Sequence, residues 1–152
     1  MHSRMTNPVF VVPEALKALN TLGTSIAKNG VPNTTLELVR LRASQINGCS
    51  VCVGMHGGAL KKAGQSDDRL FSVAAWRDTP YFTDAERAAL ALTEAVTRLN
   101  DREDPVPDEV WNEAAKHYDE KALAALLVSI AGINVWNRLN AAVRQPAGGK
   151  WN

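Results

Sequence analysis

Apolar residues recur at helical spacing along most of this chain, and this periodicity limits the possible fold more than any other feature. After Pro13, for example, the side chains of Leu16, Leu19, Leu22 and Ile26 fall on one face of a helix. No stretch alternates apolar and polar residues over about five positions, and no hairpin turn dipeptide separates two such stretches. We therefore predict an all-α fold.

Capping residues and helix breakers divide the chain into predicted helices. Ser66, Thr83 and Asp119 are N-cap candidates, and Thr83 forms a capping-box pattern with Glu86. The segment 8–12 is predicted to be extended. The expected helices span residues 13–30, 34–46, 49–63, 67–74, 84–99, 108–117 and 120–144.

Charge and length exclude some classes of protein. Seventeen Lys and Arg residues balance sixteen Asp and Glu residues, giving a net charge of +1 without any basic block. The chain therefore lacks the electrostatic signature of a nucleic-acid-binding protein. Its 152 residues suit one domain that buries enough surface to fold without disulfides or metals. We expect a single helical domain over residues 1–152.

The apolar segments argue against a membrane protein. The longest apolar run covers residues 122–133, interrupted by Ser129, and is shorter than the ~18 residues that a membrane-spanning helix needs. We predict that it is a buried core helix. Residues 1–7 show no signal-peptide pattern. Two cysteines without an export signal favour a reducing, cytoplasmic location in which thiols do chemistry.

The most informative residues for function are Cys49, Cys52 and His56. Their positions i, i+3 and i+7 share one helical face, and the Cα atoms of an i, i+3 pair lie close enough for a reversible disulfide. Gly48 breaks the preceding helix and so places Cys49 near a helix N-terminus, where the dipole stabilises a thiolate. His56 is a base within reach of Cys52, so the segment predicts an activated thiol.

An acid that orients His56 should come from another helix, and Glu37 is the candidate. The preceding helix ends directly before the cysteines and must fold back beside them. A structural role competes with this one, because Thr34-x-x-Glu37 is also a capping-box pattern.

This segment resembles the core of the AhpD-like alkylhydroperoxidases, within the carboxymuconolactone decarboxylase superfamily. The shared features are a glutamate twelve residues before the first cysteine, the Cys-x-x-Cys pair, and a histidine four residues after the second cysteine. Residues 82–87 and 133–138 look like later segments of the same family. The resemblance covers about residues 34–144 and leaves 1–12 and 146–152 peripheral.

The resemblance implies an all-helical subunit that assembles into dimers, trimers or hexamers, and an antioxidant dithiol that reduces hydroperoxides or passes electrons to a peroxiredoxin. Cys52 would be the thiolate that attacks the peroxide and becomes a sulfenic acid, and Cys49 the more exposed thiol that resolves it as a disulfide. His56 and Glu37 would form the proton relay. An external dithiol or a peroxiredoxin is the expected partner, and no bound cofactor is required.

One position departs from the family pattern, since Val51 stands where the well-studied members carry a second histidine. The decarboxylase branch generally lacks the Cys-x-x-Cys pair, which counts against lactone decarboxylation here. Two other interpretations remain open: a non-catalytic helical oligomer, and a zinc site built from Cys49, Cys52, His56 and Glu37.

Other conspicuous residues favour structural roles. His117 lies on an amphipathic helix and is expected at the surface. The tryptophans at helical apolar positions are expected in the core or at a subunit interface: Trp76, Trp111 and Trp136. The polar residues within the apolar final helix are expected to be pinned by hydrogen bonds: Asn134, Asn137 and Arg138.

Overall fold

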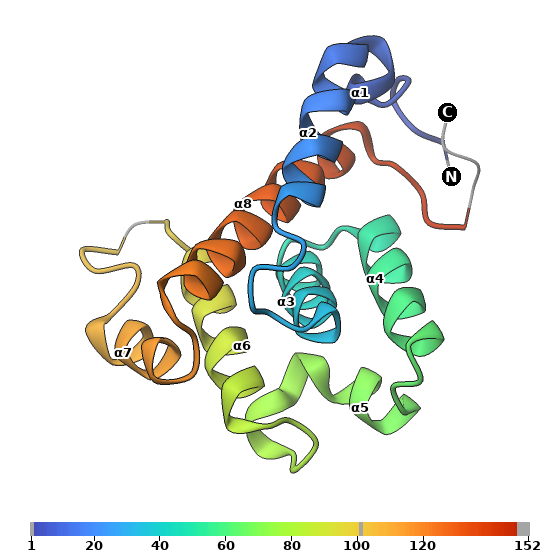
Figure 1. Ribbon diagram of the computed structural model, residues 1–152. Coiled ribbons are helices and arrows are strands. Elements are labelled where there is room, and N and C mark those ends of the chain that lie inside the picture. The colour runs from blue at the N-terminus through green and yellow to red at the C-terminus, as the bar shows by residue number, and fades with distance from the viewer. Residues whose placement is uncertain (1, 101, 149–152) are drawn as a thin grey trace.

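The computed structural model describes residues 2–100 and 102–148, and this part of the chain contains helices and no strand (Figure 1). The all-α prediction is confirmed. The elements in chain order are α1 (Pro8–Val11), α2 (Pro13–Ser25), α3 (Asn33–Ile46), α4 (Ser50–Lys62), α5 (Asp67–Ser72), the 3₁₀ helix η1 (Val73–Asp78), α6 (Asp84–Thr97), α7 (Asp108–His117) and α8 (Glu120–Val143).

Helix α3 lies at the centre of the fold (Figure 1). It buries side chains on two faces. On one face, Val39 belongs to a core cluster with Leu92 of α6 and Ile130 of α8. On the other, Leu38 belongs to a second cluster with Leu60 of α4 and others from η1 and α6. Because α3 is fixed from both sides, the residues at its C-terminal end have well-defined positions.

Helix α8 is long and apolar enough to cross a membrane, and no other helix in the described ranges is. Half of its most apolar stretch is buried inside the molecule. Its buried side chains, such as Leu126 and Ile130, pack into the core shared with α3 and α6. Such burial is what the sequence predicts for a core helix of a globular domain.

The predicted caps of three helices are present. The Oγ atom of Ser66 accepts a hydrogen bond from the backbone N–H of Arg69 at the start of α5. Thr83 and Glu86 form a reciprocal capping box at the start of α6. Asp119 accepts from the backbone N–H of a residue in the first turn of α8. These local signals correctly place the helix starts.

The N-terminal region differs from the prediction. Residues 8–11 form the short helix α1 instead of an extended segment, because the side chain of Asn7 caps the backbone N–H of Val9. Asn7 and Val9 are almost completely buried, although residues 1–12 were expected at the periphery. The following helix, α2, ends at Ser25, before Gly30. Residues 149–152 of the expected C-terminal periphery lie outside the described residues.

The capping-box interpretation of Thr34 and Glu37 is wrong. Pro32 occupies the N-cap position of α3 with extended backbone, and no side chain caps this helix. Thr34 therefore already lies inside the first turn. Glu37 is consequently free to serve the other predicted role, toward His56.

Charged side chains around the buried carboxylate of Glu94 join α3, η1 and α6, and we call them, together with Trp76, the Glu94 cluster. The Glu94 carboxylate accepts hydrogen bonds from four side chains: Arg42, Trp76, Arg77 and Arg98. Burial opposes the charge of Glu94, but hydrogen bonds from Arg77, Trp76 and Arg42 outweigh it and lower its pKa to about 2. The cluster therefore holds a carboxylate that stays charged where α3, η1 and α6 meet.

Candidate active site

The turn between α3 and α4 positions the two cysteines. Gly48 has φ of +66°, a left-handed conformation that favours glycine, and it ends α3 and redirects the chain. The backbone N–H of Cys49 then bonds to the carbonyl oxygen of Ser44, at 3.0 Å. Cys49 becomes the N-cap of α4, as its predicted place near a helix N-terminus requires.

A disulfide joins Cys49 to Cys52, with 5.4 Å between their Cα atoms. The Sγ atom of Cys49 also accepts a hydrogen bond from the backbone N–H of Cys52, at 3.4 Å. Each cysteine is only 3% exposed, so the expectation that Cys49 is the more exposed of the two is wrong for this subunit. The two cysteines differ in another way, because Cys52, unlike Cys49, is among the residues that line a cavity.

Glu37 and His56 meet as predicted. The Oε2 atom of Glu37 lies 2.7 Å from Nδ1 of His56, and its Oε1 atom accepts a hydrogen bond from Arg40 at 2.6 Å. Burial opposes the charge of Glu37, but His56 and Arg40 outweigh this effect and hold its pKa below the usual value. Arg40 is itself fixed by a 3.0 Å bond from Nε to Ser129 of α8. The carboxylate therefore stays charged and orients the imidazole ring.

A cavity of about 530 Å³ lies between α2, α4 and α8. Its walls are mostly apolar and include Phe10, Leu19, Ile133 and Trp136. Polar residues also line it, from α2, α3, α4 and α8: Asn20, Thr24, Arg40, Cys52, His56, Ser129 and Asn140. Trp136 thus contributes to a cavity wall, whereas Trp76 is buried in the core and Trp111 is 39% exposed. The predicted thiol and base share one apolar chamber.

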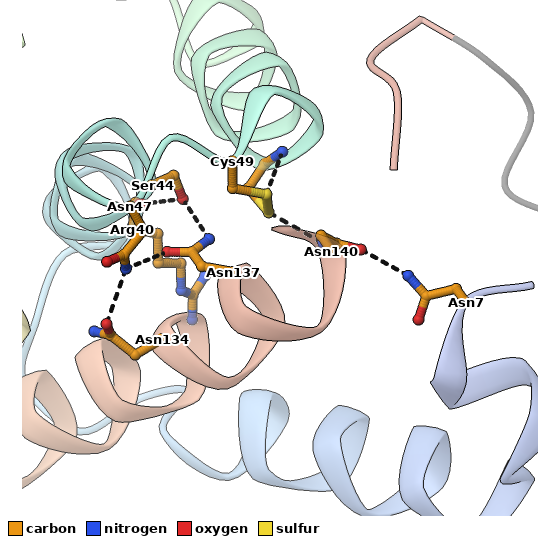
Figure 2. Close-up of a disulfide and its surroundings, with 9 residues drawn as sticks. Asn7, Arg40, Ser44, Asn47, Cys49, Asn134, Asn137 and Asn140 are labelled. Carbon is orange, nitrogen blue, oxygen red and sulfur yellow. Dashed lines mark hydrogen bonds between the residues drawn. A yellow bond between two sulfur atoms is a disulfide. The ribbon is translucent and has the colours of Figure 1, made fainter. Parts of the chain in front are cut away.

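Asparagines lie near the cysteine-bearing turn, all buried except the half-buried Asn47, and we call Asn7, Asn47, Asn134, Asn137 and Asn140 the asparagine cluster (Figure 2). The Nδ2 group of Asn47 donates to Oδ1 of both Asn134 and Asn137, at 2.9 Å each. Asn137 in turn donates to the hydroxyl of Ser44. These bonds confirm the predicted structural role of Asn134 and Asn137, and they tie the end of α3 to α8.

Four residues at the site were not predicted from the sequence: Asn7, Arg40, Ser129 and Asn140. Asn140 follows Asn137 at i+3, so the face of polar residues on the final helix extends one turn further than predicted. Arg40 lies at i+3 from Glu37, the spacing of a helical ion pair. No local pattern points to Asn7, whose partner is 133 positions away.

The described residues offer no group of three or more His, Cys, Asp or Glu side chains arranged to hold a metal ion. Within the four residues of the alternative zinc interpretation, the two sulfurs are bonded to each other, and the side chains of Glu37 and His56 bond to each other. His117 is exposed, as expected, and contacts Glu113 on its own helix.

Comparisons with known proteins agree with this architecture. The uncharacterized protein YdfG of Bacillus subtilis is 33% identical over 140 residues, which cover 92% of this chain and 94% of YdfG. A crystal structure from Agrobacterium tumefaciens, of a protein of unknown function provisionally named as the antioxidant defence protein AhpD, matches with a TM-score of 0.89. That protein is 32% identical, and the match covers 98% of this chain and all of the other.

A more distant structural relative is the debrominase Bmp8, with a TM-score of 0.81, 21% identity, and coverage of 93% of this chain and 75% of Bmp8. Bmp8 has also been crystallised, as a cysteine-to-alanine variant, with 2,3,4-tribromopyrrole. At the level of sequence families, the carboxymuconolactone decarboxylase family matches residues 13–95. This chain, with its AhpD-like helical fold, belongs to the carboxymuconolactone decarboxylase family.

Proposed function

We propose that this protein is a thiol-dependent alkylhydroperoxidase that uses Cys52 as the attacking thiolate. The observation that carries the proposal is the position of Cys52. It forms a disulfide with Cys49 and faces the same apolar cavity as His56, which Glu37 orients. A thiol, a base and an acid that orients the base are the parts that nucleophilic catalysis requires.

The proposed cycle begins with the reduced dithiol. The Cys52 thiolate attacks the outer oxygen of a hydroperoxide, the O–O bond breaks, and the products are a Cys52 sulfenic acid and an alkoxide. His56 supplies the proton that turns the alkoxide into an alcohol. The Cys49 thiol then displaces hydroxide from the sulfenic acid, and water and the Cys49–Cys52 disulfide form. An external dithiol reduces the disulfide and becomes a disulfide itself.

The walls of the cavity favour an organic hydroperoxide over hydrogen peroxide. Most of the lining side chains are apolar, among them Leu16, Leu19 and Ile133. Burial of an alkyl or aryl group against such walls is favourable by about 25 cal/mol for each Å² removed from water. Arg40, His56 and Asn140 line the cavity together with Cys52, so a bound hydroperoxide would place its O–O bond beside Cys52 and its apolar part against the leucine and aromatic side chains of the walls.

The proposal extends to partners and location. The electron donor is a dithiol protein or a peroxiredoxin, and the protein works in the cytoplasm, where such donors are reduced. We also propose a homo-oligomer. Helix α2 has no buried residue in the isolated subunit, and Phe10, Val11, Val12 and Leu22 are each at least 39% exposed. No nucleic acid or membrane enters the proposed activity.

Steady-state reduction of cumene hydroperoxide with dithiothreitol tests the assignment of roles. Cys52→Ser should abolish turnover. Cys49→Ser should keep one turnover and leave a sulfenic acid on Cys52, which dimedone traps for mass spectrometry. Ser50→Ala, between the cysteines and exposed, is the matched control and should retain turnover. Full turnover by Cys52→Ser would refute the proposal.

A second candidate is reductive dehalogenation of an aromatic ring, favoured by the fold shared with Bmp8 and by the aromatic wall residues Phe10 and Trp136. The dithiol would supply two electrons, so that a C–Br bond becomes C–H and the products are bromide, a proton and the Cys49–Cys52 disulfide. Release of bromide from 2,3,4-tribromopyrrole by the reduced protein measures this activity. Bromide release without hydroperoxide reduction would favour the second candidate.

A further inference from the structure

We propose that Asn140 is a further catalytic residue of the dithiol site and that Asn7 is its positioning residue. Asn140 would stabilise the negative charge on the Cys52 sulfur whenever the disulfide is reduced. The inference deepens the proposed function, because it assumes that the cysteines cycle between disulfide and dithiol.

The contact lies directly on the reacting atom. The Nδ2 group of Asn140 donates to Sγ of Cys52 at 3.2 Å (Figure 2). Asn140 is 2% exposed and Cys52 is 3% exposed, so little water reaches this contact. A buried thiolate without a hydrogen-bond donor would pay the full cost of lost hydration. Asn140 supplies a donor from a helix other than the one that carries the cysteines.

The orientation of the Asn140 amide is fixed by a chain of hydrogen bonds that begins at a backbone N–H. The N–H of Val9, which can only donate, bonds to Oδ1 of Asn7 at 3.2 Å. The Nδ2 group of Asn7 must therefore be its donating end, and it bonds to Oδ1 of Asn140 at 2.7 Å. This leaves the Nδ2 group of Asn140 facing the sulfur. The hydrogen bond at the start of α1 thus determines which end of the Asn140 amide faces Cys52.

The N-terminal segment is held in place independently of Asn7. The backbone N–H of Arg4 donates to the carbonyl oxygen of Val143 at 2.8 Å, and its guanidinium donates to that of Ala142. Asn7 is completely buried beside this anchor. A substitution at Asn7 should therefore change the hydrogen bond to Asn140 without releasing the whole segment from α8.

The other charged or titratable groups beside Cys52 come from two helices. Arg40 of α3 and His56 of α4 line the cavity, and Glu37 of α3 contacts both of them. The residues that α1, α2 and α8 contribute to the lining are uncharged. A hydrogen bond to a charged acceptor is roughly twice as strong as a neutral one, so the Asn140 contact favours the thiolate over the disulfide. Asn140 should therefore make the disulfide easier to reduce.

The test uses the pH dependence of Cys52 alkylation by iodoacetamide in a Cys49→Ser background, which requires no peroxide. Asn140→Leu keeps the approximate shape of the side chain and removes the donor. It should raise the apparent pKa of Cys52 by about one unit, a tenfold loss of thiolate, which is the size of one hydrogen bond to a charged group. With both cysteines present, the same tenfold effect should lower the reduction potential by about 30 mV in a dithiol buffer.

Variants at Asn7 test the positioning role and leave Asn140 in place. Asn7→Ala should raise the apparent pKa of Cys52 by less than Asn140→Leu does. Asn7→Asp should raise it more than Asn7→Ala, because a carboxylate only accepts and would turn the Asn140 carbonyl oxygen toward the sulfur. Asn137→Ala is the matched control, since Asn137 is equally buried on α8 and bonds to Asn47 and Ser44. Asn137→Ala should leave the pH dependence of Cys52 alkylation unchanged.

An unchanged profile in folded Asn140→Leu would overturn the inference, as would an equal shift in Asn137→Ala. If Asn140→Leu does not fold, the two Asn7 variants decide: the inference fails unless Asn7→Asp raises the apparent pKa of Cys52 more than Asn7→Ala does. The expected shifts in a protein that reduces no hydroperoxide would support the inference about Asn140 while the proposed function fails. Hydroperoxide reduction with no shift in the pKa of Cys52 in any variant would support the proposed function and overturn the inference about Asn140.

Discussion

Two buried polar clusters hold this helical chain together, and they differ in charge. The Glu94 cluster is a carboxylate surrounded by arginines, with a pKa of about 2 that keeps it ionised. The asparagine cluster around the cysteines is neutral, and its one sulfur contact comes from an amide. Because Glu94 stays ionised, its ion pairs with the arginines are suited to a structural contact between helices. The Cys52 sulfur, in contrast, gains and loses charge during the proposed cycle. Neutral amide dipoles suit such a sulfur, because they stabilise its thiolate form less strongly than a salt bridge would.

The largest expected effect concerns the proton relay at the cavity. Glu37→Gln keeps the shape of the side chain but removes the charge that orients His56, and should lower hydroperoxide turnover about a hundredfold, within the range of general acid–base catalysis. Stopped-flow oxidation of the reduced protein measures this. The chain offers a matched control, because Glu113 also contacts a histidine, His117, on the exposed helix α7. Glu113→Gln should leave turnover unchanged, and an equal loss in both variants would contradict the assignment.

The second largest effect separates stability from activity. Glu94→Gln leaves the buried donors Arg42 and Trp76 with a weaker acceptor, and should lower the free energy of unfolding by about 3 kcal/mol. Urea denaturation at pH 7 measures the loss, and peroxide turnover per folded molecule should stay the same. A folded Glu94→Gln protein with lost turnover would show that the two clusters are coupled.

The lowered pKa of Glu94 also predicts how the stability difference between wild type and Glu94→Gln depends on pH. The pKa of Glu94 is about 2 in the folded state, against an ordinary value of 4.5 in the unfolded chain. A lowered pKa contributes stability that is complete above pH 4.5 and is lost as the pH falls toward 2. The difference in unfolding free energy between wild type and Glu94→Gln should therefore shrink steadily over this range. A difference that stays constant down to pH 2 would contradict the lowered pKa.

The smallest effect concerns the glycines at the two ends of α4. Gly48 and Gly64 both have left-handed backbone, with φ of +66° and +79°, and space for a Cβ atom around each. Alanine at either position should cost about 1 kcal/mol of stability, measured by thermal or urea unfolding. Only Gly48→Ala should also alter the rate of disulfide formation, because Gly48 precedes the cysteine N-cap. Equal redox behaviour in the two variants would show that the turn does not tune the cysteines.

Local patterns predicted the parts of the fold and site that depend on local spacing. Helical periodicity and the caps at Ser66, Thr83 and Asp119 placed most helices, and the residues around Cys49 led to His56 and Glu37. The meeting of Glu37 with His56 depended on the short turn after α3, which forces that helix to fold back beside α4. The segment 8–12 was mistaken because one side-chain cap, from Asn7, overrides the extended preference expected there.

The unpredicted parts depend on contacts between distant residues. Asn7 and Asn140 are 133 positions apart, and Arg42 and Glu94 are 52 apart. An isolated asparagine near the N-terminus fits a turn or a cap equally well, and a glutamate within a helix usually faces solvent. Only the packing of α8 and α6 against α3 shows that these polar groups point inward.

The number of free thiols left after the reduced protein meets a hydroperoxide shows whether Cys49 and Cys52 are a peroxide-reducing pair. The protein is reduced, freed of reductant, and mixed with one equivalent of cumene hydroperoxide, with and without a chelator. Alkylation and mass spectrometry then count the remaining thiols. We predict that both thiols are consumed in a Cys49–Cys52 disulfide, with one equivalent of alcohol formed, whether or not the chelator is present. Two thiols that remain free after the peroxide is added would contradict it.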